Sequence, residues 1–429
     1  MKIILAGTLA LTLVGTPAGA DDVVDALDAA AKPLTSDLTP FGRMVGDAKV
    51  VGVGEATHSS SEFYTLNKQL FSYLATEKGF TTFAREISWA TGVRLNDYVL
   101  NGKGDPGAIL HAESRGPYDL FDNRELLDLI TWMRGHNTTH KEKVQFMGAD
   151  LLYPGGVLFD QVLAYVKQAR PRLLPTFNRL YKGLRPTTPD AGVYMGMALQ
   201  ESLTDRMDKA KRAAKALRLL EGQGSGSEHA WAVQHARALT QTFTGYAFED
   251  QKEAQVYRDK AMADNVAWWN RATGAKIQLS GLNPHISLAP IDPAFVPSPL
   301  GGVLRKTFGK RYVSVGTTFD HGGYNFAIEK GNCPNGSKPA ERPLTCKGSV
   351  ESAPGGYNEQ VLDQVRFKDF ILDTRTALPT ARTWLTAARP TRVIGGGFWA
   401  PGEDLKVAIG TSYDVLIHLN TVKAAKLLP

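Results

Sequence analysis

The feature that most constrains the fold is the alternation of short β-branched or apolar runs with stretches of helical periodicity. The run Lys49–Val53 is followed by apolar residues at the spacing of one helix face: Phe63, Leu66, Leu70, Phe71 and Leu74. Similar runs recur at Thr81–Ala84, Val144–Met147, Lys276–Leu279, Tyr312–Val315, Phe370–Leu372, Arg392–Ile394 and Val415–Leu419. Because strands that alternate with helices pair in parallel, we predict an α/β protein with a mainly parallel central sheet flanked by helices.

One long region departs from this alternation. Between about 158 and 271 no convincing strand appears, and helical patterns cover Tyr194–Leu220, Glu228–Phe243 and Lys252–Asn270. The glycine- and serine-rich segment Gly222–Glu228 separates two of these patterns as a flexible link. A chain of 429 residues accommodates two domains or one large domain with an insertion. We predict the second arrangement, an all-helical lobe inserted into an α/β domain that spans 21–429.

The first twenty residues, "MKIILAGTLALTLVGTPAGA", have the layout of a secretory signal peptide. Lys2 precedes an apolar run from Ile3 to Val14, and small residues end the segment with cleavage expected after Ala20. The alternative is a membrane anchor, but the run is shorter than the roughly 20 residues that a spanning helix needs. We therefore expect an exported protein, periplasmic or secreted, that is not in the membrane after cleavage.

The cysteines fit an oxidising compartment. Cys333 and Cys346 are the only two in the chain, and they bracket the loop "CPNGSKPAERPLTC". We predict one disulfide that closes this loop. The alternatives are two free thiols or half of a metal site, although no further soft ligand lies nearby in sequence.

Charge and motifs exclude several classes of function. The formal charge is +6, and the Lys and Arg residues are spread along the chain without a long basic run, so nucleic-acid binding is not expected. The chain has no GxSxG, HExxH or P-loop motif, and "GVGEAT" lacks the third glycine of a dinucleotide fingerprint. Serine hydrolases, zinc peptidases of that type and nucleotide-binding proteins therefore lose their usual support.

Polar side chains follow most of the predicted strands, where each run ends. Because the carboxyl ends of parallel strands meet at one edge of a sheet, these residues are expected to gather there. They are Glu55, His58, Arg85, Glu86, Asp150, Asn283, His285, Asp320, His321, Asp373 and Arg375.

The turn around His58 has chemistry of its own. Ser59 and Glu62 have the spacing of a capping box, which places His58 just before a helix N-terminus. The positive end of that helix disfavours imidazolium, so a neutral ring able to accept a proton is expected near neutral pH. Glu55 or Glu86 would then orient the ring and stabilise it once it is protonated. The simpler alternative is a polar turn between a strand and a helix.

Several segments together resemble the erythromycin esterase family. The family opens with a strand, a GE-x-x-H turn and a helix, as this chain does at His58, and has a glutamate where this chain has Glu86. The resemblance rests on the segments "VVGVGEATHSSSEFY", "GFTTFAREISWA", "FDNRELLDLITWMRGHN", "FMGADLLY", "YRDKAMADNVAWW" and "LNPHIS".

The resemblance implies a metal-independent hydrolase, without cofactor, that opens the lactone ring of macrolide antibiotics. By position, His58 is similar to the family's general base, Glu55 and Glu86 to its essential carboxylates, and His285 to its second active-site histidine. The substrate is then a small-molecule macrolide or another ester. We expect the substrate-binding side chains to be Arg85, Trp89, Asn283 and His321.

The chain departs from the family pattern at Asn67, where an arginine is frequent, and at Leu282, which replaces the first histidine of an HN-x-H segment. Both departures are expected to alter the surrounding pocket.

Two further functions remain open. Glu55, His58, Glu86 and His285 are adequate ligands for the metal of a metal-dependent hydrolase or peptidase. His58 or His321 would suit an axial position in an exported haem-binding protein.

Overall fold

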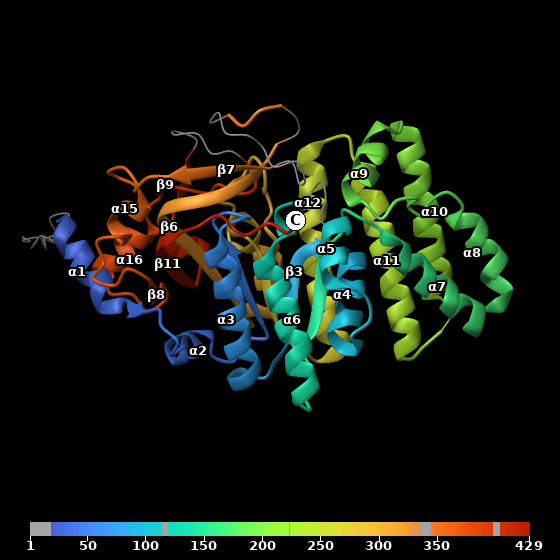
Figure 1. The fold of residues 1–429 in the computed structure, drawn as a ribbon, viewed down its shortest axis with the longest axis horizontal. Coiled ribbons are helices and arrows are strands. Elements are labelled where there is room, and N and C mark those ends of the chain that lie inside the picture. The colour runs from blue at the N-terminus through green and yellow to red at the C-terminus, as the bar shows by residue number, and fades with distance from the viewer. Residues whose placement is uncertain (1–18, 114–118, 223, 329–330, 335–344, 398–403) are drawn as a thin grey trace, which may run out of the picture.

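The computed structural model describes residues 19–113, 119–222, 224–328, 331–334, 345–397 and 404–429. Residues 1–18 of the predicted signal peptide and residue 223 of the predicted link lie outside these ranges, whereas Ala20 begins the first helix. A nine-stranded sheet runs through the α/β part (Figure 1). In spatial order its strands are β1 (Lys32–Pro33), β8 (Phe370–Asp373), β11 (Val415–Val422), β6 (Tyr312–Ala327), β2 (Val50–Glu55), β5 (Lys276–Leu282), β3 (Phe80–Ser88) and β4 (Gln145–Asp150), with β7 (Thr345–Val350) paired to β6.

The strands from β11 to β4 are all parallel, which confirms the predicted sheet type. The remaining strands of this sheet pair antiparallel: β8 with β11, β1 with β8, and β7 with β6. Since β8 runs against β11, its carboxyl end lies at the opposite edge from the ends of the parallel strands. The expectation that Asp373 and Arg375 join the other polar strand-end residues is therefore wrong.

Most strands extend beyond the runs that predicted them. Glu55 and Asp150 are the last residues of β2 and β4, and Glu86 lies within β3, because pairing with the neighbouring strand continues past the apolar residues. The predicted strand Arg392–Ile394 is wrong. The strand in this region is β9 (Arg389–Thr391), which pairs only with β10 (Leu405–Val407) in a separate two-stranded sheet.

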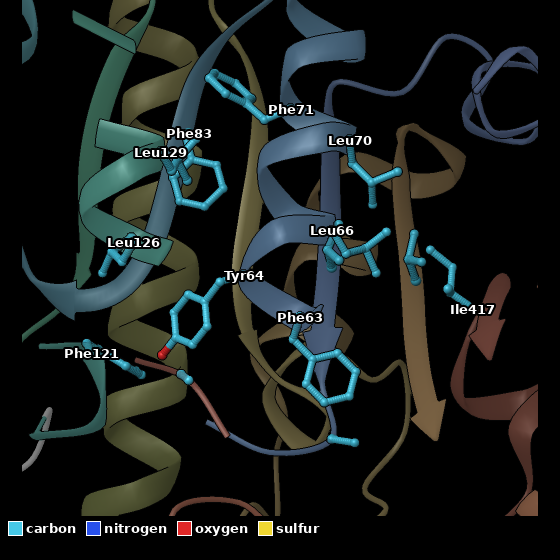
Figure 2. Packing of buried hydrophobic residues seen from close by; sticks show 14 of the residues in the cluster. Phe63, Tyr64, Leu66, Leu70, Phe71, Phe83, Phe121, Leu126, Leu129 and Ile417 are labelled. Atoms are coloured by element: carbon cyan, nitrogen blue, oxygen red, sulfur yellow. The ribbon is translucent and has the colours of Figure 1, made fainter. Parts of the chain in front are cut away.

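One face of the sheet is covered by α2 (Thr39–Val45), α3 (Ser61–Lys78) and α6 (Arg124–Thr139). The apolar stripe of α3 supplies Phe63, Leu66 and Leu70 to the core, where Figure 2 shows them among other buried apolar side chains. Phe71 meets Phe83 of β3 at a ring-centroid distance of 5.4 Å. The helical periodicity seen in the sequence is thus the core-facing side of α3.

The opposite face is covered by the helices that connect β4 to β5, together with α14 (Leu300–Phe308). Figure 1 shows several of the connecting helices gathered as a lobe beyond β4. In the described residues between β4 and β5 there are helices and no strand, as predicted. These helices are α7 (Gly155–Ala169), α8 (Leu174–Tyr181), α9 (Ala191–Gln200), α10 (Leu203–Glu221), α11 (Ser227–Tyr246) and α12 (Gln251–Thr273).

A third apolar cluster lies at the β8 end of the sheet and includes Leu27, Leu372 and Trp384. The helices there are α1 (Ala20–Ala30), α15 (Asn358–Leu362), α16 (Pro379–Thr386) and α17 (Ile409–Ser412). Cys333 and Cys346 form the predicted disulfide, with a Cα–Cα separation of 5.7 Å. None of the helices in the described ranges has the length and apolarity required to span a membrane.

The C-terminal segment after β11 runs across the start of two helices. The Lys423 carbonyl accepts a hydrogen bond from the Ser61 amide at 2.7 Å, and the Lys426 carbonyl accepts one from the Arg124 amide at 2.8 Å. The Ala425 amide donates to the Ser59 carbonyl at 3.0 Å. The segment therefore satisfies main-chain groups that helix N-termini leave unpaired.

This arrangement replaces the predicted capping box, which is wrong. The N-cap of α3 is Ser60, without a side-chain cap, and the Glu62 carboxylate accepts from the Lys423 amide at 2.6 Å. The Ser59 hydroxyl instead accepts a hydrogen bond from the Asn325 side chain at 2.8 Å. Contacts from the far end of the chain thus fix the turn that carries His58.

We expect truncation after Val422 to destabilise the fold, because the main-chain partners of Ser59, Ser61 and Arg124 are removed together. With about 1 kcal/mol for each lost hydrogen bond, these three bonds alone should lower the free energy of unfolding by about 3 kcal/mol, and the loss of the Lys423–Glu62 and Leu428–Asp122 bonds should add to this; urea denaturation measures the change. The double variant Lys423→Ala/Lys426→Ala keeps the main-chain bonds and should stay close to wild type. Equal stability of the truncated and full-length proteins would contradict this role of the segment.

Candidate active site

The polar residues at the ends of β2, β5 and β3 form one buried cluster. Strand β5 lies between β2 and β3, with Glu55 opposite Leu282 and Arg85 opposite Ser280. These side chains therefore share the carboxyl edge of the sheet, defined here as the edge at which its parallel strands end. Residues distant in sequence meet there because parallel strands end together.

Glu55 and Arg85 form an ion pair with no exposed surface on either side chain. The Arg85 Nη1 group donates to Glu55 Oε1, and Nη2 donates to Oε2 at 3.1 Å. The Ser280 hydroxyl donates to the same Oε1 at 2.9 Å. Burial alone raises the pKa of Glu55, but Arg85 and then His58 outweigh it and hold the pKa below its usual range. Glu55 is therefore a fixed carboxylate.

Aromatic rings enclose the Arg85 guanidinium. Its central carbon lies 4.2 Å from the centroid of the Phe121 ring and 4.9 Å from that of Tyr64. The ring faces attract the cation and exclude water from it. This environment holds Arg85 behind Glu55, away from solvent.

His58 lies in front of Glu55, on the turn between β2 and α3. Its Nδ1 atom is 3.4 Å from Glu55 Oε2, and its ring meets the edge of Phe121 at a centroid distance of 4.9 Å. The backbone holds the turn, since the His58 amide donates to the Gly395 carbonyl at 2.9 Å. The His58 side chain is 14% exposed, in contrast to the enclosed groups behind it. With Nδ1–H directed at Glu55, Nε2 is left as a proton acceptor.

A second buried set surrounds Glu86. Its Oε1 accepts a hydrogen bond from Arg258 Nη2 at 2.8 Å, and its Oε2 accepts one from the Leu282 amide at 3.0 Å. Arg258 also binds both carboxylate oxygens of Asp150. Burial alone raises the pKa of Glu86, but His285 and then Arg258 outweigh it and hold the pKa well below its usual range.

His285 lies between two carboxylates. Its Nδ1 is 2.9 Å from Asp259 Oδ1, its Nε2 is 3.3 Å from Glu86 Oε1, and the side chain is 1% exposed. Burial alone lowers the pKa of His285, but Asp259 and Glu86 outweigh it and raise the pKa to about 10. At neutral pH His285 is thus an imidazolium whose two N–H groups donate to Asp259 and Glu86.

The structure therefore gathers Glu55, His58, Glu86 and His285 at one edge of the sheet. The Glu55 and Glu86 sets adjoin through β3, where Arg85 and Glu86 are consecutive, and the charge of a protonated His58 lowers the pKa of Glu86. The catalytic roles assigned to these residues from sequence stay predictions.

The residues expected to bind substrate are mostly enclosed. Arg85 has no exposed surface, and Trp89 is 2% exposed with its indole N–H donating to His235 Nδ1 at 3.2 Å. Asn283 joins β5 to β6, because its side chain donates to the Thr317 carbonyl at 2.7 Å and accepts from the Thr317 amide at 3.1 Å. In this conformation these side chains support the edge of the sheet, and their contact with substrate stays a prediction.

His321, the remaining expected substrate residue, belongs to a different set of contacts. It lies within β6, with Nδ1 2.9 Å from Asp320 Oδ2 and Nε2 3.0 Å from the Thr421 hydroxyl. Asp320 in turn accepts a hydrogen bond from the Ser352 hydroxyl at 2.6 Å. The structure thus ties His321 to β11 and to the segment after β7.

The departures from the family pattern occupy different surroundings. Asn67 is 1% exposed, and its side chain bonds to the Phe63 carbonyl and to Gln278 in the core. The expectation that Asn67 alters the pocket does not fit this position. Leu282 lies close to the His58 turn. A Cβ atom placed on Gly395 would be 3.7 Å from the Leu282 side chain, and a Cβ atom placed on the next residue, Gly396, would be 3.5 Å from the His58 ring. Its apolar side chain therefore lies near the segment that holds the His58 turn.

The site residues predicted from the sequence include none from α12. Arg258 and Asp259 are consecutive on this helix and bind the Glu86 set from the lobe side. The segment "YRDKAMADNVAWW" contains both residues, so the signal was present in the sequence. Its meaning depends on α12 packing against the ends of β4 and β5, which the sequence pattern does not specify.

Among the described side chains, no group of three or more His, Cys, Asp or Glu is arranged to hold a metal ion. Glu55 and Glu86 direct their carboxylates at arginines, and His285 directs its nitrogens at carboxylates. The edge of the sheet is thus built from alternating fixed charges.

We expect Asp259→Asn to lower the pKa of His285, because the largest favourable charge is removed. A folded-state pKa raised to about 10 from 6.5 adds stability that is fully present below about pH 6.5 and lost as the pH rises toward 10. The stability advantage of wild type over the variant should therefore be largest near pH 6.5 and shrink toward pH 10. Urea denaturation across this range measures it.

The matched control is Asp264→Asn on the exposed side of the same helix, where Asp264 pairs with Lys260 at 2.5 Å. This variant should follow the wild-type pH dependence. A constant stability difference between wild type and Asp259→Asn over the whole range would contradict the coupling of Asp259 to His285.

Comparisons with known proteins agree with the fold and the motifs. The family model for erythromycin esterase matches residues 75–422, a range that begins after the His58 turn. Erythromycin esterase type II of Escherichia coli is 26% identical over 317 residues, which cover 68% of this chain and 74% of the relative. A crystal structure of a Bacillus cereus protein has a TM-score of 0.85 at 29% identity, covering 96% of this chain and all of the other.

A mutant of the erythromycin esterase EreC in its open conformation has a TM-score of 0.69 at 16% identity. The alignment covers 92% of this chain and 96% of EreC, and at this identity it shows the shared fold. The fold similarity alone does not assign a family, whereas the family model does, because it matches most of the chain. This chain belongs to the erythromycin esterase family.

Proposed function

We propose that this protein is a carboxylic ester hydrolase that opens the lactone ring of macrolides by direct attack of water, which inactivates the antibiotic. The observation that carries the proposal is the His58–Glu55 pair. His58 combines a partly exposed ring with a buried carboxylate at its Nδ1, the arrangement that a general base needs. The E. coli relative named as an erythromycin esterase supports the choice of substrate.

In this mechanism His58 Nε2 takes a proton from a water molecule as that water attacks the ester carbonyl. Glu55 holds the ring in the correct tautomer and stabilises the imidazolium that forms. The Nδ1–Oε2 separation is 3.4 Å, and in this mechanism the contact shortens as the ring becomes positively charged. The bound Arg85 keeps Glu55 ionised throughout.

The Glu86 set contains two cations, His285 and Arg258, and the three carboxylates that bind them, Glu86, Asp150 and Asp259. In this mechanism the set therefore contributes fixed, oriented groups rather than net positive charge. His285 is enclosed, and direct protonation of the leaving alkoxide by its Nε2–H would require Glu86 to move. Because these charges are fixed before substrate binds, little reorganisation is needed during the reaction.

We also propose that the protein acts outside the cytoplasm. The disulfide between Cys333 and Cys346 is typical of an oxidising compartment, and the N-terminal twenty residues have the pattern of a signal peptide. A macrolide would then be opened before it crosses the inner membrane or outside the cell.

The decisive experiment incubates the purified protein with macrolides and simpler esters and measures products heavier by one water by mass spectrometry. We expect His58→Ala to lose at least about 10²-fold in rate, because general-base catalysis contributes this much. The matched control is His140→Ala, at the exposed C-cap of α6, which should retain full activity. A loss below about tenfold in His58→Ala would remove the role of the base.

The panel also separates the alternatives. Absence of product from every macrolide, with turnover of simpler esters, would reject the macrolide substrate and keep the hydrolase. Loss of activity after dialysis against a chelator, restored by one metal, would favour the metal-dependent hydrolase instead.

We expect Glu55→Gln to lower kcat by at least about 10²-fold, since the amide stabilises the wrong tautomer of His58 and cannot support its positive charge. The variant also leaves Arg85 buried without its carboxylate, which costs about 3–5 kcal/mol of stability. Activity should therefore be measured per folded molecule at a temperature where circular dichroism shows the native state. Wild-type kcat in folded Glu55→Gln would show that His58 does not depend on Glu55.

A further inference from the structure

A cavity of about 840 Å³ lies beside β4, the outermost strand of the sheet, and is lined by residues of α4 (Trp89–Asn101) and of the lobe helices α7 and α11. Figure 1 shows where these helices lie. Its size falls within the roughly 300–1,000 Å³ of small-molecule sites. The described side chains that line it do not include Glu55, His58, Glu86, Arg258 or His285. Apart from Trp89, one of the side chains expected to bind substrate, the lining is separate from the candidate active site.

Indole rings form one wall of this cavity. Trp89 from α4, Trp231 from α11 and Trp269 from α12 all line it, with ring centroids 5.7 Å apart for Trp89 and Trp269 and 5.3 Å apart for Trp231 and Trp269. The Trp269 N–H donates to the Thr82 hydroxyl at 3.0 Å, which fixes that ring. Trp89 and Trp269 are 2% and 3% exposed and pack against Trp231, so Trp231 is the ring of this wall that offers accessible surface.

His235 places a hydrogen-bond donor beside the indoles. The residue is 4% exposed, and its Nδ1 accepts the Trp89 indole N–H at 3.2 Å, so the ring hydrogen of the neutral tautomer is on Nε2. In the described structure no protein group binds Nε2, and Nε2 is not fully buried. Because His235 lines the cavity, this N–H is available to a molecule inside it.

Glu113 lines the same cavity, but its carboxylate is enclosed. Its Oε1 binds Arg94, and its Oε2 has almost no accessible surface. Each cation of the lining forms an ion pair with a carboxylate of the lining, in the pairs Arg94–Glu113, Lys103–Asp97 and Arg185–Asp160. The formal charges therefore cancel, and a charged ligand would have to break one of these pairs.

We propose that this cavity binds an uncharged, hydroxyl-rich ring, the chemistry of a neutral sugar. A hydroxyl group both accepts and donates, which matches the His235 N–H and the side-chain amides on the same lining. The apolar C–H face of a sugar ring packs on an indole, and the side-chain amides of Asn101, Gln145 and Gln161 offer further hydrogen bonds to its rim. The site goes beyond the proposed esterase activity and does not depend on it.

The test is titration of the full chain with maltotetraose, cellotetraose and chitotetraose, followed by tryptophan fluorescence and calorimetry. At least one of these sugars should bind to wild type. Trp231→Ala should weaken that binding by about tenfold, through loss of the stacking surface. His235→Phe keeps an aromatic ring but removes the donor, and should weaken binding by a similar factor.

Trp268→Ala is the matched control, because Trp268 packs against Trp231 at 4.9 Å without lining the cavity. It should bind as wild type does, and so should His58→Ala. Thermal unfolding establishes that each variant is folded before titration. Failure of all the sugars to bind wild type, unchanged binding in both Trp231→Ala and His235→Phe, or equal weakening in Trp268→Ala would overturn the proposal.

Discussion

The buried ion pair between Arg85 and Glu55 is the interaction on which the candidate site depends. Two charges with no exposed surface persist only when each is fully paired, and here Ser280 and the rings of Tyr64 and Phe121 complete the enclosure. The pair joins β2 to β3 across β5. It therefore fixes both the edge of the sheet and the carboxylate against which His58 is oriented.

Arg258 repeats this principle between the sheet and the helical lobe. Through Arg258 and Asp259, α12 binds Asp150 at the end of β4, Glu86 on β3 and His285 after β5. The lobe is thus joined to the sheet by charge as well as by the apolar cluster beneath it. Because each carboxylate faces a cation, the site holds its charges in place before any substrate arrives, which is the condition for electrostatic catalysis.

Much of the fold follows from periodicity. The parallel sheet and the helical stretch between β4 and β5 were predictable, because strands and helices bury their apolar residues at different spacings. The errors have a common cause. Three local inferences were overturned by distant segments. The C-terminal residues replaced the capping box at Ser59, and pairing with β10 placed the strand before Arg392–Ile394. The direction of β8 placed Asp373 at the opposite end of the sheet.

The sequence by itself determined the residue types of the candidate site and its family. Glu86 and His285 lie within the range that the family model matches, and Glu55 and His58 lie in the strand–turn–helix motif that precedes it. Only the tertiary structure decided how these residues are paired. Burial and the approach of Arg85, Arg258 and Asp259 make His285 cationic, keep Glu55 ionised and leave His58 the partly exposed member. Charge state depends on neighbours in space, and packing of α12 against the sheet brings those neighbours from positions far apart along the chain.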